Sequence, residues 1–324
     1  MIWFLAALAA AAGLALIFFP ASARGRARGA DRFARIVGLA IPPQLTGAVE
    51  ASLARRSRVI GVGLVVGAVV ALPVALLTPS GDDGEGLLTG RLWPAIGVFV
   101  LVVGVVSGLG SLLRRRPPID GVRYARTTEV RLDDYVAPFE LGFVRVVAAL
   151  GAVGALAAGI RVALQPELLG PSIPFLAAGV VAAIALVAFE VVGRRIVAAP
   201  QPSGSPAELA WNDALRMADL RDLTIAPSMM GAFALLGAAV PFVTGGRADG
   251  PNPIGAAIMA GLFLAVIVAL VICMAVMYSK GSPQTHFLRR LWPAVAVEAG
   301  RAAPQRVDAR TTASGTPSTD GSVR

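Results

Sequence analysis

The sequence has almost none of the residues from which metal sites and disulfides are built. Its 324 residues include one cysteine, Cys273, and one histidine, His286. A single cysteine cannot form a disulfide within the chain, and one cysteine with one histidine cannot supply the ligand clusters of the usual zinc sites. We therefore expect no metal and no cofactor.

Lysine and aromatic residues are also scarce. Lys280 is the one lysine, and it follows Ser279 without the glycine-rich loop of a Walker A motif, which argues against a nucleotide-driven pump. His286 lies just past the last apolar stretch, which argues against proteolysis within the membrane. Aromatic residues make up 6% of the chain, so its apolar surface is rich in small residues that suit close helix packing in lipid.

Long apolar runs are what the sequence does have. Hydrophobic residues make up 56% of the chain, and they gather in seven stretches, each close to the ~20 residues of a transmembrane helix. The stretches are Ile2–Phe19, Val59–Leu77, Trp93–Leu113, Leu141–Ile160, Ile173–Val192, Ile225–Val243 and Pro253–Met277. We predict an all-α fold, a polytopic transmembrane bundle of about seven helices, because helices satisfy their own backbone in lipid.

The arginines predict the orientation of these helices. If the N-terminus faces out, every basic residue except Arg91, Arg161 and Arg247 falls in a segment that faces the cytoplasm. The chain is then N-out and C-in, in a plasma membrane. The net charge of +9 lies beside the hydrophobic blocks, which favours anionic lipid headgroups over nucleic acid as the partner of the basic segments.

The stretches also predict the domain organisation. Residues 1–300 form one transmembrane domain with cytoplasmic juxtamembrane segments at 24–57, 114–140 and 193–224, and residues 301–324 form a disordered tail. After the N-terminal helix, the other six group as three two-helix hairpins. Ser205-Pro206-Ala207-Glu208 is a capping box that opens a polar helix through about Leu223. The apolar residues of that helix form no single stripe, so we interpret it as juxtamembrane.

The N-terminal stretch has a second interpretation. Ala21-Ser22-Ala23 resembles a signal-peptidase site. The stretch lacks a basic region before it, however, and Arg24, Arg26 and Arg28 follow at once. We therefore expect a retained helix.

Two charged residues lie about one turn inside the apolar stretches. Arg145 and Glu190 would pair across the hairpin of the fourth and fifth helices. Alternatively each reaches the interface by itself, with Glu190 pairing to Arg194 four residues on. The small-residue pairs Gly63/Gly67 and Gly104/Gly108 are candidate helix-packing positions.

The middle of the chain resembles a known pattern. The run Arg194 to Pro202, Asn212-Asp213-Ala214-Leu215-Arg216 and Asp134-Tyr135-Val136 are similar to segments of an uncharacterised multi-span membrane protein family of actinobacteria. That family usually has Arg where this chain has Ala199, and often an acidic residue where it has Asn212. The resemblance implies a bacterial membrane protein and no particular activity.

One segment resembles an enzyme signature, but its residue spacing does not match that signature. Asp120-Gly121-Val122-Arg123-Tyr124-Ala125-Arg126 resembles the start of the CDP-alcohol phosphotransferase signature, whose carboxylates hold two metal ions. Here one residue too many separates Gly121 from Ala125, which turns Ala125 by about 100° on a helix, and the later Gly and Asp spacing is missing. We interpret the segment as a solvated loop.

These observations favour a protein without catalytic activity. Our leading hypothesis is a structural or accessory subunit of a membrane assembly, with a protein partner or a homo-oligomer left open. The alternative is a permease or channel-like carrier for an apolar or lipid-like solute, which needs no buried charge. A membrane-embedded lipid enzyme comes third, because no catalytic residues were found.

Overall fold

The structure is a computed structural model that describes residues 2–77, 92–112, 129–201, 203–238, 257, 261 and 285–295. Within these ranges every regular element is a helix, which confirms the all-α class. The helices are α1 (Ile2–Phe18), α2 (Ala23–Val37), α3 (Thr46–Leu77), α4 (Leu92–Leu112), α5 (Leu132–Tyr135), α6 (Pro138–Leu164), α7 (Leu169–Ala198), α8 (Pro206–Gly237) and α11 (His286–Leu291). Short 3₁₀ turns lie at Phe19–Ala21, Pro43–Leu45 and Pro166–Leu168.

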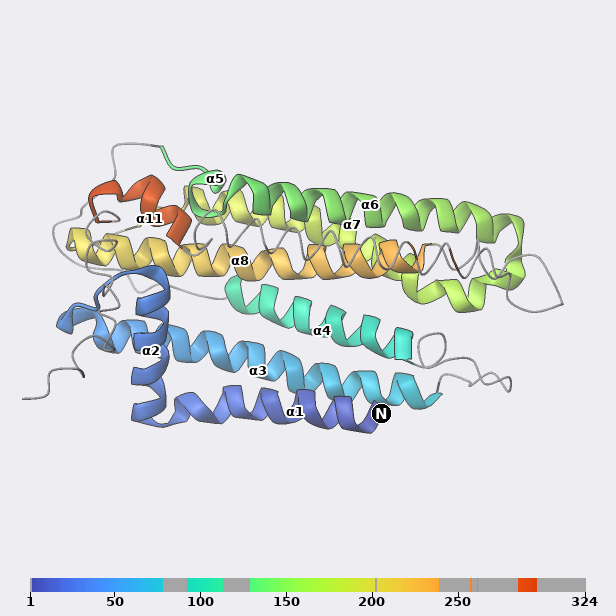
Figure 1. Cartoon of the computed structure of the whole chain (residues 1–324), viewed down its shortest axis with the longest axis horizontal. Coiled ribbons are helices and arrows are strands. Elements are labelled where there is room, and N and C mark those ends of the chain that lie inside the picture. Colours follow the sequence, from blue (N-terminus) through green and yellow to red (C-terminus); the bar gives the residue numbers. More distant parts are fainter. Residues whose placement is uncertain are drawn as a thin grey trace, which may run out of the picture.

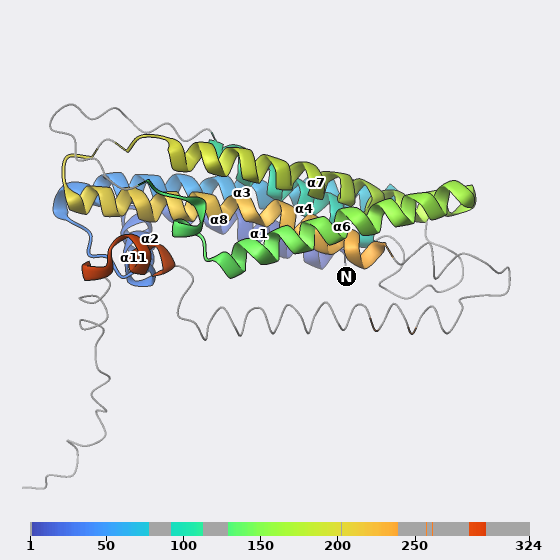
Figure 2. The ribbon, with the colours of Figure 1, turned by 90° about the horizontal axis from the view of Figure 1, so that it is seen from above.

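The long helices lie side by side along one axis (Figure 1). α1 packs on α3, α3 on α4 and α4 on α8, while α6 and α7 pack on each other and on α8. α3 with α4 and α6 with α7 thus form two of the predicted hairpins. In the view from above, α8 runs next to α7 and crosses α6 (Figure 2). α8 is therefore the central helix of the bundle.

α2 departs from the common axis. The chain bends by 103° between α1 and α2, so α2 crosses the end of the bundle (Figure 1). Ser22 starts the helix, because its hydroxyl accepts a hydrogen bond from the backbone N–H of Gly25 at 3.0 Å. Gly38 ends it with φ of 73°, a left-handed conformation that glycine adopts without strain.

The described parts of the first six predicted stretches each lie in a single helix, apart from a terminal residue, but α3 and α8 begin well before theirs. Ser205 caps α8 as predicted, with the Glu208 N–H donating to its hydroxyl at 3.2 Å. The predicted end at Leu223 is wrong, since α8 continues unbroken to Gly237 and joins the polar helix to the sixth stretch. Several parts of our predictions lie outside the described residues: residues 114–128 of the second juxtamembrane segment with the motif 120–126, residues 239–243 of the sixth stretch, the stretch 253–277 apart from 257 and 261, the tail 301–324, Arg91, Arg247, Cys273 and Lys280.

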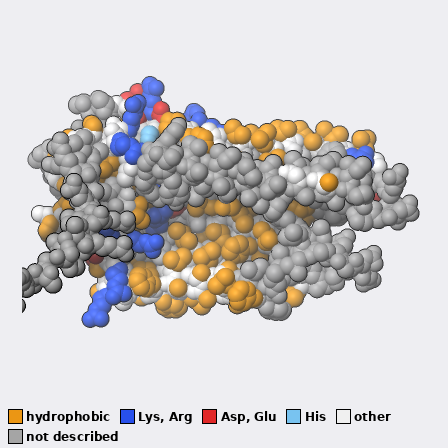
Figure 3. Space-filling model, viewed as in Figure 1, with side chains coloured by type: hydrophobic (Ala, Val, Ile, Leu, Met, Phe, Trp, Pro, Cys, Tyr) orange, Lys and Arg blue, Asp and Glu red, His pale blue; other side chains and the backbone are white. Residues whose placement is uncertain are grey.

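The described helices fit a membrane protein. Three of them, 43–77, 138–164 and 172–198, are long and apolar enough to cross a membrane, and the bent pair α1–α2 would be a fourth. Large apolar side chains also cover the outside of the bundle, including Leu156 at 66% exposed and Ile184 at 63% exposed (Figure 3). Soluble monomers seldom present so wide an apolar surface, whereas lipid accepts it.

Candidate functional site

One end of the bundle carries a core built from distant parts of the chain. We call it the end cluster and define it as α2, residues 46–53 of α3, α5, residues 206–222 of α8, and α11, which meet where α2 crosses the bundle (Figure 1). Its buried apolar side chains include Val37, Val49, Tyr135, Trp211, Met217 and Phe287. Trp211 ties α8 to the connection between α2 and α3, because its Nε1 donates to the carbonyl of Ala40 at 2.9 Å. The predicted juxtamembrane segments thus fold together.

A buried carboxylate lies at the centre of the end cluster. Asp213 of α8 is 0% exposed. The Tyr135 hydroxyl donates to its Oδ1 at 2.7 Å, and Trp292 Nε1 donates to its Oδ2 at 3.0 Å. The Gln201 amide, oriented to satisfy both neighbours, donates to the same Oδ1 at 3.0 Å and accepts from Arg216 Nε at 3.1 Å. One carboxylate therefore binds donors from three other segments of the chain.

Arg216 closes the end of α7. Its Nη1 donates to the carbonyl of Val197 at 3.0 Å, and its Nη2 donates to that of Ala199 at 2.7 Å. A cation suits this place, because the last carbonyls of a helix lack partners and carry partial negative charge. Burial raises the pKa of the Tyr135 hydroxyl above its ordinary 10.0, the Asp213 carboxylate adds to this, and Arg216 opposes it. Tyr135 therefore stays a hydrogen-bond donor.

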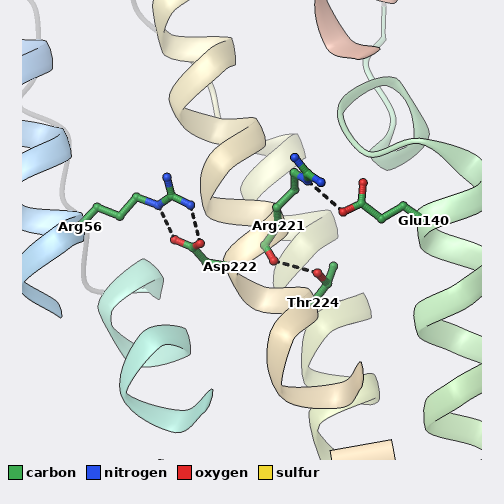
Figure 4. Close-up of polar contacts among 5 residues, drawn as sticks. All are labelled: Arg56, Glu140, Arg221, Asp222 and Thr224. Atoms are coloured by element: carbon green, nitrogen blue, oxygen red, sulfur yellow. Dashed lines mark hydrogen bonds and ion pairs between the residues drawn. The ribbon is translucent and has the colours of Figure 1, made fainter. Parts of the chain in front are cut away.

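A second set of charges ties α8 to both of its neighbours. Arg56 of α3 binds Asp222 with two parallel hydrogen bonds, Nε to Oδ2 at 2.7 Å and Nη2 to Oδ1 at 2.6 Å. On the opposite side of α8, Arg221 Nε donates to Glu140 Oε1 of α6 at 2.9 Å (Figure 4). The Asp222 and Glu140 side chains are 6% and 12% exposed. We call these four residues the charge layer; it links α3, α8 and α6.

The predicted charged pair lies next to this layer. Arg145 Nε donates to Glu190 Oε1 at 2.6 Å, so the structure places the two side chains together across α6 and α7. Arg194 Nη2 also reaches Glu190, at 3.4 Å to Oε2, which is the contact of the alternative interpretation. Both contacts are present at once. The Arg145 side chain is 48% exposed, so this pair is more accessible to solvent than the charge layer.

The predicted packing glycines face neighbouring helices. A Cβ built on each would lie 3.5 Å from Val103 for Gly63, 3.0 Å from Phe99 for Gly67, 2.9 Å from Ala226 for Gly104 and 3.8 Å from Leu223 for Gly108. Gly67 and Gly104 therefore sit in tight contacts of α3 with α4 and of α4 with α8. The other two have ordinary van der Waals neighbours.

Other glycines approach backbone even more closely. A Cβ on Gly13 of α1 would lie 2.7 Å from the carbonyl oxygen of Gly61 in α3. A Cβ on Gly231 of α8 would lie 2.7 Å from the carbonyl oxygen of Val147 in α6. Such approaches bring helix axes close enough for extensive van der Waals contact in lipid.

The polar groups of this end hold helices together. The carboxylates of Asp213, Asp222 and Glu140 all accept hydrogen bonds from donors on other segments. Among the described residues, no group of three or more His, Cys, Asp and Glu side chains is placed to bind a metal ion. His286, the one histidine, has its Nε2 2.9 Å from the backbone carbonyl oxygen of Asp133. The arrangement fastens segments of the chain together.

Known proteins add no analogy to this geometry. No family model, no curated protein and no solved structure matches the chain. The resemblance to an actinobacterial family therefore stays a prediction.

Sequence reasoning missed the residues that organise this end. From the sequence, Arg216 and Arg221 count only as basic residues of a predicted cytoplasmic segment, whereas Arg216 is 4% exposed and Arg221 is paired. The signal was present in α8, where Asp213, Arg216, Asp219 and Asp222 recur every three residues and are all buried. This helix has no single apolar stripe, and from the sequence we interpret it as juxtamembrane. The same pattern also occurs in a helix that is surrounded on all sides by polar partners.

Proposed function

We propose that this chain is a multi-pass protein of the bacterial plasma membrane, with about seven spans, its N-terminus outside and its C-terminus inside. We further propose that it has no catalytic activity and serves as a structural or accessory subunit of a membrane assembly. The end cluster is then its cytoplasmic face.

The distribution of arginine supports this orientation. On the face seen in Figure 3, the visible basic side chains gather mainly at the end of the bundle where α2 crosses, whereas hydrophobic side chains cover the flank beside it. Exposed Arg24, Arg55 and Arg195 belong to this end, while Arg161 lies in the last turn of α6 at the opposite end. A cytoplasmic end cluster agrees with the preference of inner loops for cations.

The observation that carries the proposed role is the internal use of buried charge. Catalytic carboxylates and transport sites need groups that can meet a substrate. Here the Asp213 and Asp222 carboxylates bind donors from other helices of the same chain. Burying a charge is costly unless it is paired, so this pattern favours a fixed, rigid cytoplasmic face, which suits the docking of another protein.

Purification from native membranes tests the role. The tagged full chain is extracted in mild detergent, and mass spectrometry identifies the proteins and small molecules that come with it. We expect a stoichiometric protein partner. Asp213→Asn, which weakens the end cluster, should reduce the yield of that partner. Asp31→Asn makes the same chemical change at an exposed position of α2 and should not.

Two results would overturn the proposal. A chain that purifies alone with one defined lipid or solute would make transport the function to test. A partner that binds the Asp213→Asn protein as well as the wild type would show that the end cluster is not the docking face.

A further inference from the structure

α2 carries its arginines on one face. Arg24, Arg28, Arg32 and Arg35 follow at steps of four, four and three residues, and all four side chains are exposed. Residues at this spacing share one side of a helix, so they form a row roughly 17 Å long, which we call the arginine stripe. The opposite side of α2 is buried against α3 and α8 through Ala30, Phe33 and Val37.

The arginine stripe differs from the other arginines of this end. Arg26 on the same helix lies 3.9 Å from Glu50 and donates to the carbonyl of Ala21 at 3.0 Å. Arg56 is bound by a carboxylate of α8. Among the described residues, the four stripe arginines make no hydrogen bond or ion pair, and Asp31 is the one acidic residue of α2. Asp31 is exposed on the same side of the helix, three residues after Arg28 and four before Arg35, so four cations and one anion give this face a net charge of +3.

The position of α2 fixes what the stripe would face. The apolar helix α1 ends at Phe18, and Phe19 begins the 3₁₀ turn that follows; the two are 66% and 54% exposed. α2 begins only a few residues later and lies across the bundle axis. If α1 crosses the membrane, α2 therefore lies within about one helical turn of the edge of the hydrocarbon, at the level of the lipid headgroups. Arginine side chains are long enough to reach phosphates from there.

We propose that the arginine stripe binds the phosphate groups of anionic phospholipids and holds α2 flat on the inner membrane surface. This inference rests on the proposed placement in the membrane and goes beyond it by assigning a ligand to one helix face. Guanidinium groups bind phosphate oxygens with two parallel hydrogen bonds, and each basic residue near an anionic surface adds attraction. An acidic protein segment has the same sign of charge, but the place of α2 beside the apolar end of α1 favours lipid.

The test uses the full chain in bilayer nanodiscs of phosphatidylcholine with increasing phosphatidylglycerol. Thermal unfolding is followed by tryptophan fluorescence for the wild type, for R24Q/R28Q/R32Q/R35Q and for R24K/R28K/R32K/R35K. Phosphatidylglycerol should raise the melting temperature of the wild type. The glutamine variant should melt like the wild type in phosphatidylcholine alone, which shows that it folds. It should need at least tenfold more phosphatidylglycerol for half of the effect, since one arginine contributes about fivefold.

The lysine variant separates charge from loss of side chains, and it should keep most of the response. An equal phosphatidylglycerol response in the wild type and the glutamine variant would overturn the proposal. So would a response that inorganic phosphate in the buffer reproduces in phosphatidylcholine, because the ligand would then be free anion. Loss of a co-purifying protein by the glutamine variant, with its lipid response intact, would assign the stripe to that protein. Lipid binding without any protein partner would instead contradict the accessory role alone.

Discussion

The ion pair between Arg56 and Asp222 gives the sharpest test of the structure. We predict that the two single substitutions have unequal effects on the free energy of unfolding. Arg56→Met leaves the Asp222 carboxylate, whose side chain is 6% exposed, without its arginine, and should cost about 3–5 kcal/mol. Asp222→Leu leaves the Arg56 guanidinium, whose side chain is 25% exposed and can turn toward water, and should cost about 1–3 kcal/mol.

The double variant Arg56→Met/Asp222→Leu should recover most of this loss. Replacing both partners of a buried pair with apolar side chains of similar volume is often close to neutral. Unfolding is measured in mixed micelles with increasing dodecyl sulfate and followed by tryptophan fluorescence, because Trp211 and Trp292 both lie at this end of the protein. Arg55→Met, at the neighbouring exposed position, is the matched control and should change stability by less than about 0.5 kcal/mol.

Two results would refute this reasoning. A double variant as unstable as the sum of the single variants would mean that the two side chains do not interact in the folded protein. An Asp222→Leu protein less stable than Arg56→Met would mean that the exposed fractions do not decide which charge suffers more.

Three further predictions follow from the same geometry. Arg145→Gln and Glu190→Gln should each lower the free energy of unfolding by about 0.5–1 kcal/mol and show a coupling of similar size in a double-mutant cycle, because the pair is partly exposed to solvent. A coupling near zero would mean that Glu190 interacts with the arginine one turn along α7 and not with Arg145. Gly231→Ala should destabilise by about 1–3 kcal/mol, because its Cβ meets backbone at 2.7 Å, whereas Gly142→Ala, which meets nothing within 4 Å, should stabilise by up to about 1 kcal/mol in the same unfolding assay. The pKa of the Tyr135 hydroxyl is raised in the folded protein, so the stability that this hydroxyl contributes is complete below pH 10.0, its ordinary pKa, and is lost as the pH rises above that value. Tyr135→Phe should flatten this alkaline loss of stability. An unchanged dependence of stability on pH would contradict the burial of Tyr135.

The apolar pattern predicts where the long helices lie, because burial in lipid is a property of composition. Ile2–Phe19 and Trp93–Leu113 match α1 and α4 to within a residue at each end. The pattern says less about polar segments. α3 begins at Thr46, well before its apolar stretch, because the more polar residues before Val59 continue the same helix into the end cluster.

The candidate site could be predicted only in part. Arg145 and Glu190 stand out because charge is rare inside an apolar stretch, and the structure places them together. Asp213 and Trp292 are far apart in the sequence, and no periodicity links them. Their contact depends on how α11 returns to α8, which is a property of the tertiary arrangement. Sequence patterns likewise cannot predict ion pairs between helices when one of the two residues is assigned to a loop.

The end cluster combines early and late parts of the chain, and this sets the order in which it can form during synthesis. α2 leaves the ribosome early and α11 follows every predicted apolar stretch. The Asp213 carboxylate therefore gains its Trp292 donor only after the last stretch has been translated. A chain that ends before α11 lacks Phe287 and Leu288 in the core of the end cluster, which leaves apolar surface there for proteases and chaperones to recognise. Closure of the end cluster thus marks a chain whose synthesis has passed every predicted apolar stretch.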